Sequence, residues 1–312
     1  AIVGRICLIC FTVQIGYRVN DGHIIAQFSI DFHLDPARRV LYHQELEKPK
    51  GKSDILPTPI QHLAFAEQIL DSPALPKDAR GWLEKSDAVQ SAFFFGNIAP
   101  DVQVVSHQTR ESTHFYTLPP SNHCMGYERL LTTHGALADP STLPSAHAAF
   151  LAGYLIHLLF DELWVRQVFP VFGPGSEWED WRERLLFHNV LRAWLDEPAL
   201  VHLRGGMGLL LRKAQPDDWL PFVDDVDLCR WRDLVAEQFV PGASIRTVEV
   251  FADRAKISTD EFRHLLQSKV VQERIFGHIS VAELEAFHIR AITRSRDLLV
   301  CYLKGCVADE SE

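Results

Sequence analysis

The side chains best suited to chemistry lie in one apolar stretch, residues 150–164. His157 and Asp161 are four residues apart there, so on a helix they lie one above the other on a single face. Their neighbours are apolar on nearly every side, which predicts a buried helix. A buried carboxylate is costly unless a cation or a hydrogen-bond donor compensates it. The pair is therefore half of a divalent metal site or a His–Asp hydrogen bond inside a helical core.

Three more residues of the same chemical types lie upstream. Asp101 follows a turn through Pro100, where its carboxylate is expected at the mouth of a loop. His114 lies between Thr113 and two aromatic residues, and His62 lies one turn into an expected helix. Each fits an ordinary role on its own, because Asp is common in turns and a lone His is more often a core or surface residue than a ligand.

Taken together, these residues resemble the motifs of the zinc-dependent phospholipase C family, also called the phospholipase C/D domain. The resemblance covers about residues 57–200 and rests on order and rough spacing. Its most specific part is a Gly-x-x-x-His-x-x-x-Asp helix. The matching residues are His62, Gly96-x-x-x-Pro100-Asp101, His114-Phe115-Tyr116 and Gly153-x-x-x-His157-x-x-x-Asp161. The resemblance implies an all-α, multi-helix domain like that of phospholipase C and P1 nuclease, in which secreted members hold three zinc ions between helices.

The resemblance also implies roles for individual residues. Asp101, His114, His157 and Asp161 resemble the ligands of one zinc ion. Asp161 would bridge to a second ion, for which His62 resembles another ligand. In that family metal-activated water attacks a phosphodiester while the ions neutralise charge on the phosphoryl oxygens, the chemistry that clustered divalent ions supply. We therefore expect one to three zinc ions, with Asp101 and Asp161 as the catalytic carboxylates.

Two parts of the family pattern are missing. Secreted members use the mature N-terminal amino group as a ligand beside the first His, whereas His62 lies deep in this chain. The family's remaining zinc needs two His and a Glu at His-x-x-x-Glu spacing, but the residue four after His188 is Arg192. His188 and Asp196 are eight residues apart, about two helical turns, so His188 is retained as a further candidate ligand.

Composition narrows the class of protein. The 312 residues are 47% hydrophobic and 23% charged, near the globular average. The net charge of -10, from 31 basic and 41 acidic residues, argues against a nucleic-acid partner, which would require a basic surface. The stretch 1–16 lacks the features of a signal peptide, and no apolar run of about 18–20 residues follows. The sequence thus predicts a cytoplasmic protein without a transmembrane segment.

Helical patterns dominate from residue 57 onward, so we expect one helical domain over 57–312. Thr58-Pro59 supplies an N-cap and a first-turn proline for the first helix. Residues 1–56 differ: they are a β-leaning or disordered extension of unknown role, with β-leaning runs at 2–13 and 22–30 and a charged linker at 45–54. Further helices are expected at 80–95, 146–169, 177–195, 227–239, 260–276 and 281–302, the last with a Ser280/Glu283 capping box, and a loop-rich segment at 97–141.

The resemblance to the phospholipase C family implies a zinc-dependent phosphoric-ester hydrolase acting on a phosphodiester or phospholipid-like small molecule. The rival interpretation is a non-catalytic metal-binding or structural protein on the same scaffold, which the incomplete ligand set favours. A phosphohydrolase of the HD type is excluded, because no His is followed directly by Asp. The sequence does not predict the oligomeric state.

Overall fold

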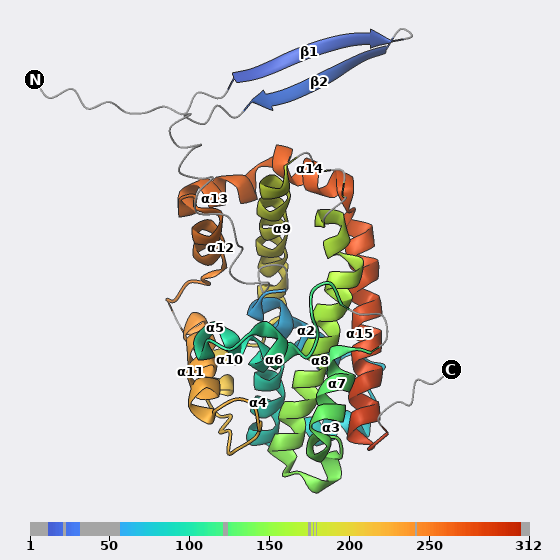
Figure 1. The fold of residues 1–312 in the computed structure, drawn as a ribbon, viewed down its shortest axis with the longest axis vertical. Helices are drawn as coiled ribbons and strands as arrows, with labels where there is room; N and C mark the ends of the chain where they lie inside the picture. The colour runs from blue at the N-terminus through green and yellow to red at the C-terminus, as the bar shows by residue number, and fades with distance from the viewer. Residues whose placement is uncertain are drawn as a thin grey trace, which may run out of the picture. The chain divides into compact units, whose positions relative to one another are not determined.

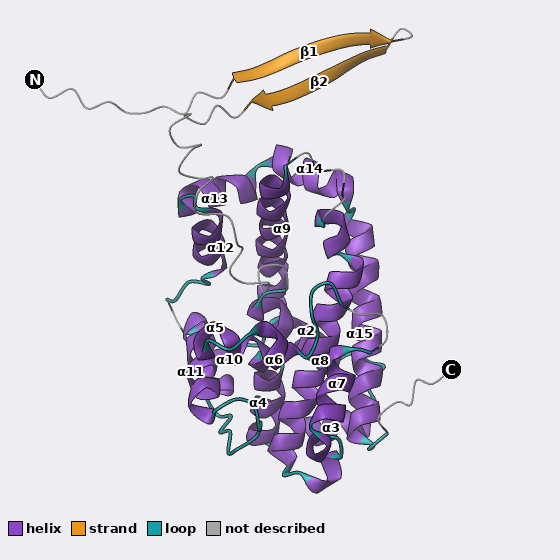
Figure 2. Cartoon of the chain, in the orientation of Figure 1, coloured by secondary structure: helices purple, strands orange, loops and turns teal. Residues whose placement is uncertain are grey.

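The computed structural model describes residues 12–20, 23–31, 57–120, 124–173, 176, 178, 180–240 and 242–306. The chain divides into two units, Ala1–Gly51 and Lys52–Glu312. In the first unit, strands β1 (Thr12–Asn20) and β2 (His23–Asp31) pair in antiparallel register, with Asn20 opposite His23 (Figure 2). Strand β2 overlaps the β-leaning run expected at 22–30. Most of the run at 2–13 and the linker at 45–54 lie outside the described residues.

The described part of the second unit is all-helical, which confirms the expected all-α class (Figure 1). Its central helix is α8 (Ser145–Gln167), in which every residue from His147 to Val165 is buried. Helices α4 (Asp87–Gly96), α7 (Gly126–Thr133) and α15 (Val281–Leu303) pack against it. Such burial requires apolar side chains all around the helix, as the sequence indicated.

Two glycines allow α4 and α8 to approach closely. A Cβ atom on Gly96 would lie 1.9 Å from the carbonyl oxygen of Phe150, and one on Gly153 would lie 2.2 Å from the carbonyl oxygen of Phe93. No side chain fits at either position without moving a helix backbone. The contact places the end of α4 directly against the middle of α8.

Helix α8 also has the length and apolar composition of a membrane span. Its most apolar window is wholly buried within the protein, and the core helix of a soluble protein passes the same test. No other helix in the described part of the chain meets this criterion.

Helix α2 (Pro59–Asp71) begins as the sequence predicts, because the Thr58 side chain accepts a hydrogen bond from the backbone N–H of Gln61 at 3.3 Å. It packs against α9 (Trp181–His202) and α15. The Ser280/Glu283 capping box expected at the start of α15 is also present. Helix α9 begins at Trp181, later than expected, because Asp180 caps it, and it continues through Pro198 to His202.

Two expected helices are each divided in two, which corrects the prediction. The expected 80–95 helix consists of α3 (Lys77–Leu83) and α4, and the expected 260–276 helix consists of α13 (Thr259–Gln267) and α14 (Lys269–His278). At each break a serine, Ser86 or Ser268, accepts a hydrogen bond from a backbone N–H of the helix that follows. A serine at this position favours a new helix start.

The segment 97–141, expected to be loop-rich, contains several short helices. They are too short to show the periodicity by which helices are recognised in sequence. The remaining elements are α5 (Gln103–Ser106), α6 (Arg110–His114), α10 (Met207–Leu211), α11 (Asp225–Ala236) and α12 (Thr247–Ala255), with 3-10 turns η2 (Ala99–Val102), η3 (Gly135–Leu137), η4 (Pro140–Thr142), η5 (Phe169–Phe172) and η6 (Glu237–Phe239).

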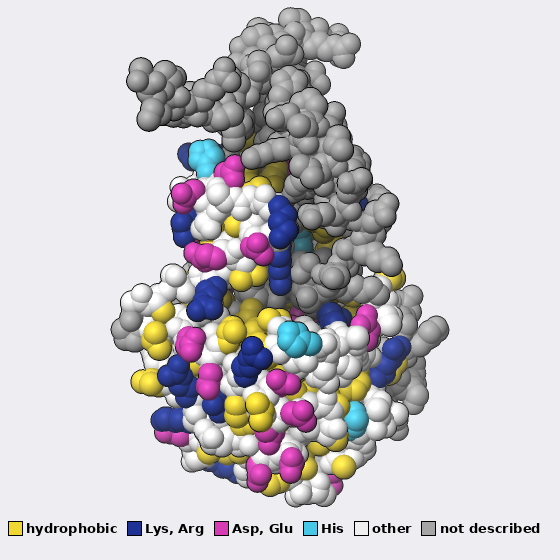
Figure 3. Space-filling view, turned by 60° about the vertical axis from the view of Figure 1, so that its left-hand side comes forward, with side chains coloured by type: hydrophobic (Ala, Val, Ile, Leu, Met, Phe, Trp, Pro, Cys, Tyr) yellow, Lys and Arg dark blue, Asp and Glu magenta, His cyan; other side chains and the backbone are white. Residues whose placement is uncertain are grey.

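Acidic and basic side chains are interspersed on the face of the molecule that Figure 3 shows.

Candidate metal site

The five residues singled out by the resemblance lie together at the centre of the helical unit. They come from α2 (His62), η2 (Asp101), α6 (His114) and α8 (His157 and Asp161). The three imidazoles and Asp161 are fully buried, whereas the Asp101 side chain is 13% exposed. The Asp101 carboxylate is therefore the member of the group that reaches the surface.

Asp161 is at the centre of the cluster. Its Oδ1 lies 3.1 Å from His62 Nε2, and its Oδ2 lies 3.3 Å from His114 Nε2 and 3.4 Å from His157 Nε2. Asp101 Oδ1 lies 3.7 Å from His114 Nε2. Two overlapping groups of candidate ligands result, His62/Asp101/His157 and His114/His157/Asp161, each with its ligand atoms within 4.8 Å of one another. Both groups could hold a metal ion.

Hydrogen bonds at Nδ1 determine which ring nitrogen of His157 and of His114 faces the cluster. His157 Nδ1 lies 2.8 Å from the carbonyl oxygen of Asn97, which only accepts hydrogen bonds, so Nδ1 carries the proton. His114 Nδ1 lies 3.0 Å from the Thr113 hydroxyl, which itself donates to the Arg110 carbonyl at 3.2 Å. We assign the proton to Nδ1 in both rings. The two Nε2 atoms, 3.4 Å apart, therefore face each other across the cluster, where a proton or a metal ion between them satisfies both.

The pKa values of the three histidines differ although each ring contacts Asp161. Burial, and then the charge of His157, lower the pKa of His62. Burial and the Arg110 charge lower the pKa of His114 to about 4. Burial alone would lower the pKa of His157, but the charge of Asp161 and its hydrogen bond outweigh burial and raise it. One negative charge thus stabilises one imidazolium, and a metal ion bound here would displace that proton.

The pKa of Asp161 agrees with this arrangement. Burial alone would raise it, but the charge of His157 and the close ring nitrogens of His114, His157 and His62 hold it well below its usual value. The carboxylate is therefore ionised, the form that binds metal.

Several buried polar atoms in the cluster have no hydrogen-bond partner. They are both ring nitrogens of His62 and Oδ1 of Asp161. The His62 Nε2 to Asp161 Oδ1 distance is short, but the angles do not make it a hydrogen bond. The His62 ring stacks on His157, with centroids 3.8 Å apart. Unsatisfied buried polar atoms are rare in folded proteins, and an ion between His62 Nε2 and Asp161 Oδ1 would satisfy these two atoms.

His188, expected as a further candidate ligand, and Asp196 lie outside the cluster. His188 accepts a hydrogen bond from the indole nitrogen of Trp164 at 3.1 Å and packs among Phe169 and Phe172. It belongs to neither candidate ligand group. Asp196 is hydrogen-bonded to Thr58, Gln61 and Thr247. The structure therefore does not bring His188 or Asp196 to the cluster.

Arg110 is a residue of this site that the sequence did not single out. Its Nη2 lies 3.4 Å from Asp161 Oδ2 and donates to the Tyr116 hydroxyl at 2.5 Å. Its position four residues before His114, one helical turn away, was the available signal.

No family model matches the sequence, and neither a curated protein nor a solved structure matches the chain. The functional interpretation therefore depends on the geometry of the cluster.

Proposed function

We propose that this protein is a zinc-dependent phosphoric-ester hydrolase with a helical fold of the phospholipase C and P1 nuclease type. The observation that carries the proposal is the triangle formed by His114 Nε2, His157 Nε2 and Asp161 Oδ2. Its three edges measure 3.3, 3.4 and 3.4 Å.

These separations match a tetrahedral zinc site. Zinc bonds to nitrogen and carboxylate oxygen measure about 2.0–2.2 Å, so tetrahedral ligand atoms lie about 3.3–3.5 Å apart. Three protein ligands with a fourth position open are typical of catalytic zinc, whereas structural zinc sites are closed. Asp101 Oδ1 lies 3.7 Å from His114 Nε2. It is either the fourth ligand of this zinc ion or a group that faces the substrate.

A second ion has fewer ligands available. His157 belongs to both candidate groups, but its Nδ1 is committed to Asn97, so its Nε2 serves one ion only. His62 Nε2 and Asp161 Oδ1 remain for a second position, which supports the bridging role proposed for Asp161. A third position has no support among the residues brought together here.

The chain's own residues prepare this site for hydrolysis. A bound divalent ion would lower the pKa of water and neutralise charge on phosphoryl oxygens. The Asn97 carbonyl and the Thr113 hydroxyl hold two imidazoles in the ligand tautomer. The partly exposed Asp101 carboxylate is the group able to accept a proton at the substrate.

The rival function is a metal-binding protein without turnover. The incomplete second and third ligand sets support it. The two functions share the metal site and differ in turnover, so the test begins with metal content.

Zinc content should be measured by elemental analysis after purification without chelator. We expect at least one zinc per chain in the wild type and its loss in His157→Ala and Asp161→Ala. His264→Ala, a substitution on the exposed side of α13, is the matched control and should keep its zinc. A wild-type protein that cannot be loaded with zinc would overturn the proposal. Zinc binding without hydrolysis across a screen of phosphodiesters and phosphomonoesters would favour the rival.

A further inference from the structure

Arg110 is a buried cation whose hydrogen-bonding capacity is largely unused. Its side chain is 4% exposed, and Nη2 makes the contacts to Tyr116 and Asp161. Its Nε and Nη1 have no hydrogen-bond partner. A guanidinium carries five N–H donors, and leaving donors unsatisfied in a buried site is costly. Partners on these two nitrogens are therefore expected in the functional state.

The surroundings hold Arg110 in place without neutralising it fully. Its guanidinium lies over the Tyr116 ring, 4.3 Å from the centroid. Burial raises the pKa of Tyr116 well above its usual value, so the phenol remains neutral. The contact with Asp161 runs through one nitrogen at 3.4 Å, longer than a typical charged hydrogen bond.

A divalent ion gives the cluster a net positive charge. Asp101, Asp161 and Arg110 together carry one net negative charge, and one divalent ion bound by neutral histidines brings the total to one net positive charge. The loaded site therefore attracts an anion, and Arg110 lies beside it, with Nη2 3.4 Å from Asp161 Oδ2.

We infer that Arg110 binds a non-bridging oxygen of a phosphoryl group held at the site. The inference rests on the proposed function and specifies its substrate class: an ester that carries a tetrahedral oxyanion. Arg is suited to this task because its planar donor set matches phosphate, and an Arg beside a metal ion stabilises charge on a transferred phosphoryl group.

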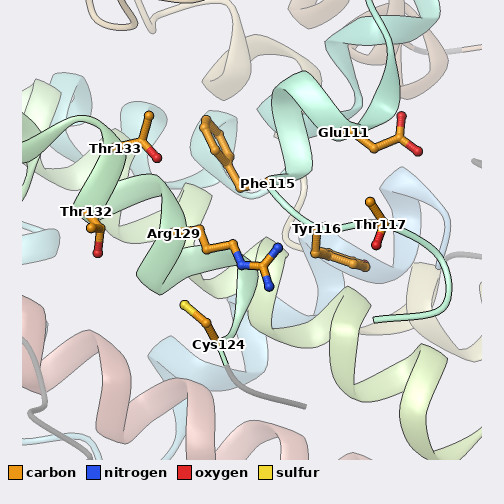
Figure 4. Close-up of a pocket in the computed structure, with 8 residues that line it drawn as sticks. All are labelled: Glu111, Phe115, Tyr116, Thr117, Cys124, Arg129, Thr132 and Thr133. Carbon is orange, nitrogen blue, oxygen red and sulfur yellow. The ribbon is translucent and has the colours of Figure 1, made fainter. Parts of the chain in front are cut away.

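Residues that flank Arg110 and His114 in the sequence line a cavity of about 400 Å³ (Figure 4). Tyr116, which touches Arg110, lines it, as do Glu111 and Arg129. In Figure 4 the Arg129 side chain extends from α7 into the space between Tyr116 and Cys124. Arg110 does not itself line the cavity, and Tyr116 is the residue that contacts both.

The test is calorimetric binding of inorganic phosphate to the full chain loaded with zinc, with acetate as a second anion. We expect Arg110→Gln to keep its zinc and to weaken phosphate binding by about ten-fold or more, because a charged hydrogen bond is lost. Arg110→Lys should bind phosphate with intermediate affinity. Arg263→Gln, an exposed substitution on α13, should match the wild type.

The outcomes separate this inference from the proposed function. The inference about Arg110 would be overturned if Arg110→Gln and Arg110→Lys bound phosphate with wild-type affinity. It would also be overturned if the substitutions weakened phosphate and acetate binding equally. Loss of zinc from both variants would also overturn it, because Arg110 would then serve only to hold Asp161. Arg110-dependent phosphate binding in a protein that takes up no zinc would support the inference and refute the zinc hydrolase.

Discussion

The backbone carbonyl of Asn97 accepts a hydrogen bond from His157 Nδ1 at 2.8 Å, across 60 residues of sequence. This contact determines which nitrogen of His157 faces the candidate metal site. Asn97 caps the end of α4, and His157 lies in the middle of α8. The orientation of a proposed ligand therefore depends on how closely two helices pack.

Gly153→Ala should disturb the site through this packing. The added Cβ would lie 2.2 Å from the Phe93 carbonyl oxygen and 2.9 Å from the Asn97 backbone nitrogen, so α4 must move away from α8. We expect the free energy of unfolding to fall by about 1–3 kcal/mol, as for other overpacked cores. We also expect weaker zinc binding, because the Asn97 carbonyl moves with α4. Urea unfolding and zinc titration measure the two effects.

Gly81→Ala is the matched control, because nothing lies within 4 Å of a Cβ added there. Gly81 lies within α3, where alanine favours helix by up to about 1 kcal/mol. This variant should be as stable as the wild type or more stable, with unchanged zinc affinity. Equal behaviour of the two variants would show that the α4–α8 contact does not position the site.

His188→Gln should leave the zinc content unchanged. The structure gives His188 a different role, because its Nε2 accepts from Trp164 at 3.1 Å, and glutamine retains an acceptor for that bond. Elemental analysis beside His157→Ala provides the comparison. Loss of one zinc equivalent from His188→Gln would restore His188 to the ligand set and contradict the arrangement seen here.

Much of this site was predictable from spacing within helices. His157 and Asp161 share one helical face at i and i+4, and the apolar residues around them indicated burial. The capped helices α2 and α15 were predictable for a similar reason, since Thr58 and Ser280 precede a helix-favouring pattern. These features are local, so the sequence contains them directly.

The long-range contacts were not predictable from spacing alone. His188 and His157 both lie on the buried parts of their helices, and only the tertiary structure places one beside Trp164 and the other in the cluster. Arg110 lies in a helix of five residues, Arg110–His114, too short to show a face. Its place in the site follows only from the folded structure, in which its Nη2 lies 3.4 Å from Asp161 Oδ2.

Asp196 provides a prediction that depends on pH. Burial raises the pKa of Asp196 from 3.8 to about 6, against opposing hydrogen bonds from Thr247, Thr58 and Gln61. In the unfolded chain the carboxyl ionises near pH 4, whereas in the folded protein it ionises near pH 6. Its contribution to the free energy of unfolding is therefore highest below pH 4, falls between pH 4 and 6, and stays constant above. About two pKa units correspond to roughly 3 kcal/mol.

Asp196→Asn removes this ionisation, since an amide stays neutral at every pH used. Subtracting wild-type from variant free energies cancels the other titrating groups, so the relative stability of the variant should rise by roughly 3 kcal/mol from pH 4 to pH 7. Urea unfolding at both pH values measures it. Asp253→Asn, at a side chain 83% exposed, controls for the amide itself. A difference that stays constant with pH would show that the three hydrogen bonds compensate for burial, and that Asp196 is ionised in the folded protein at pH 4 as in the unfolded chain.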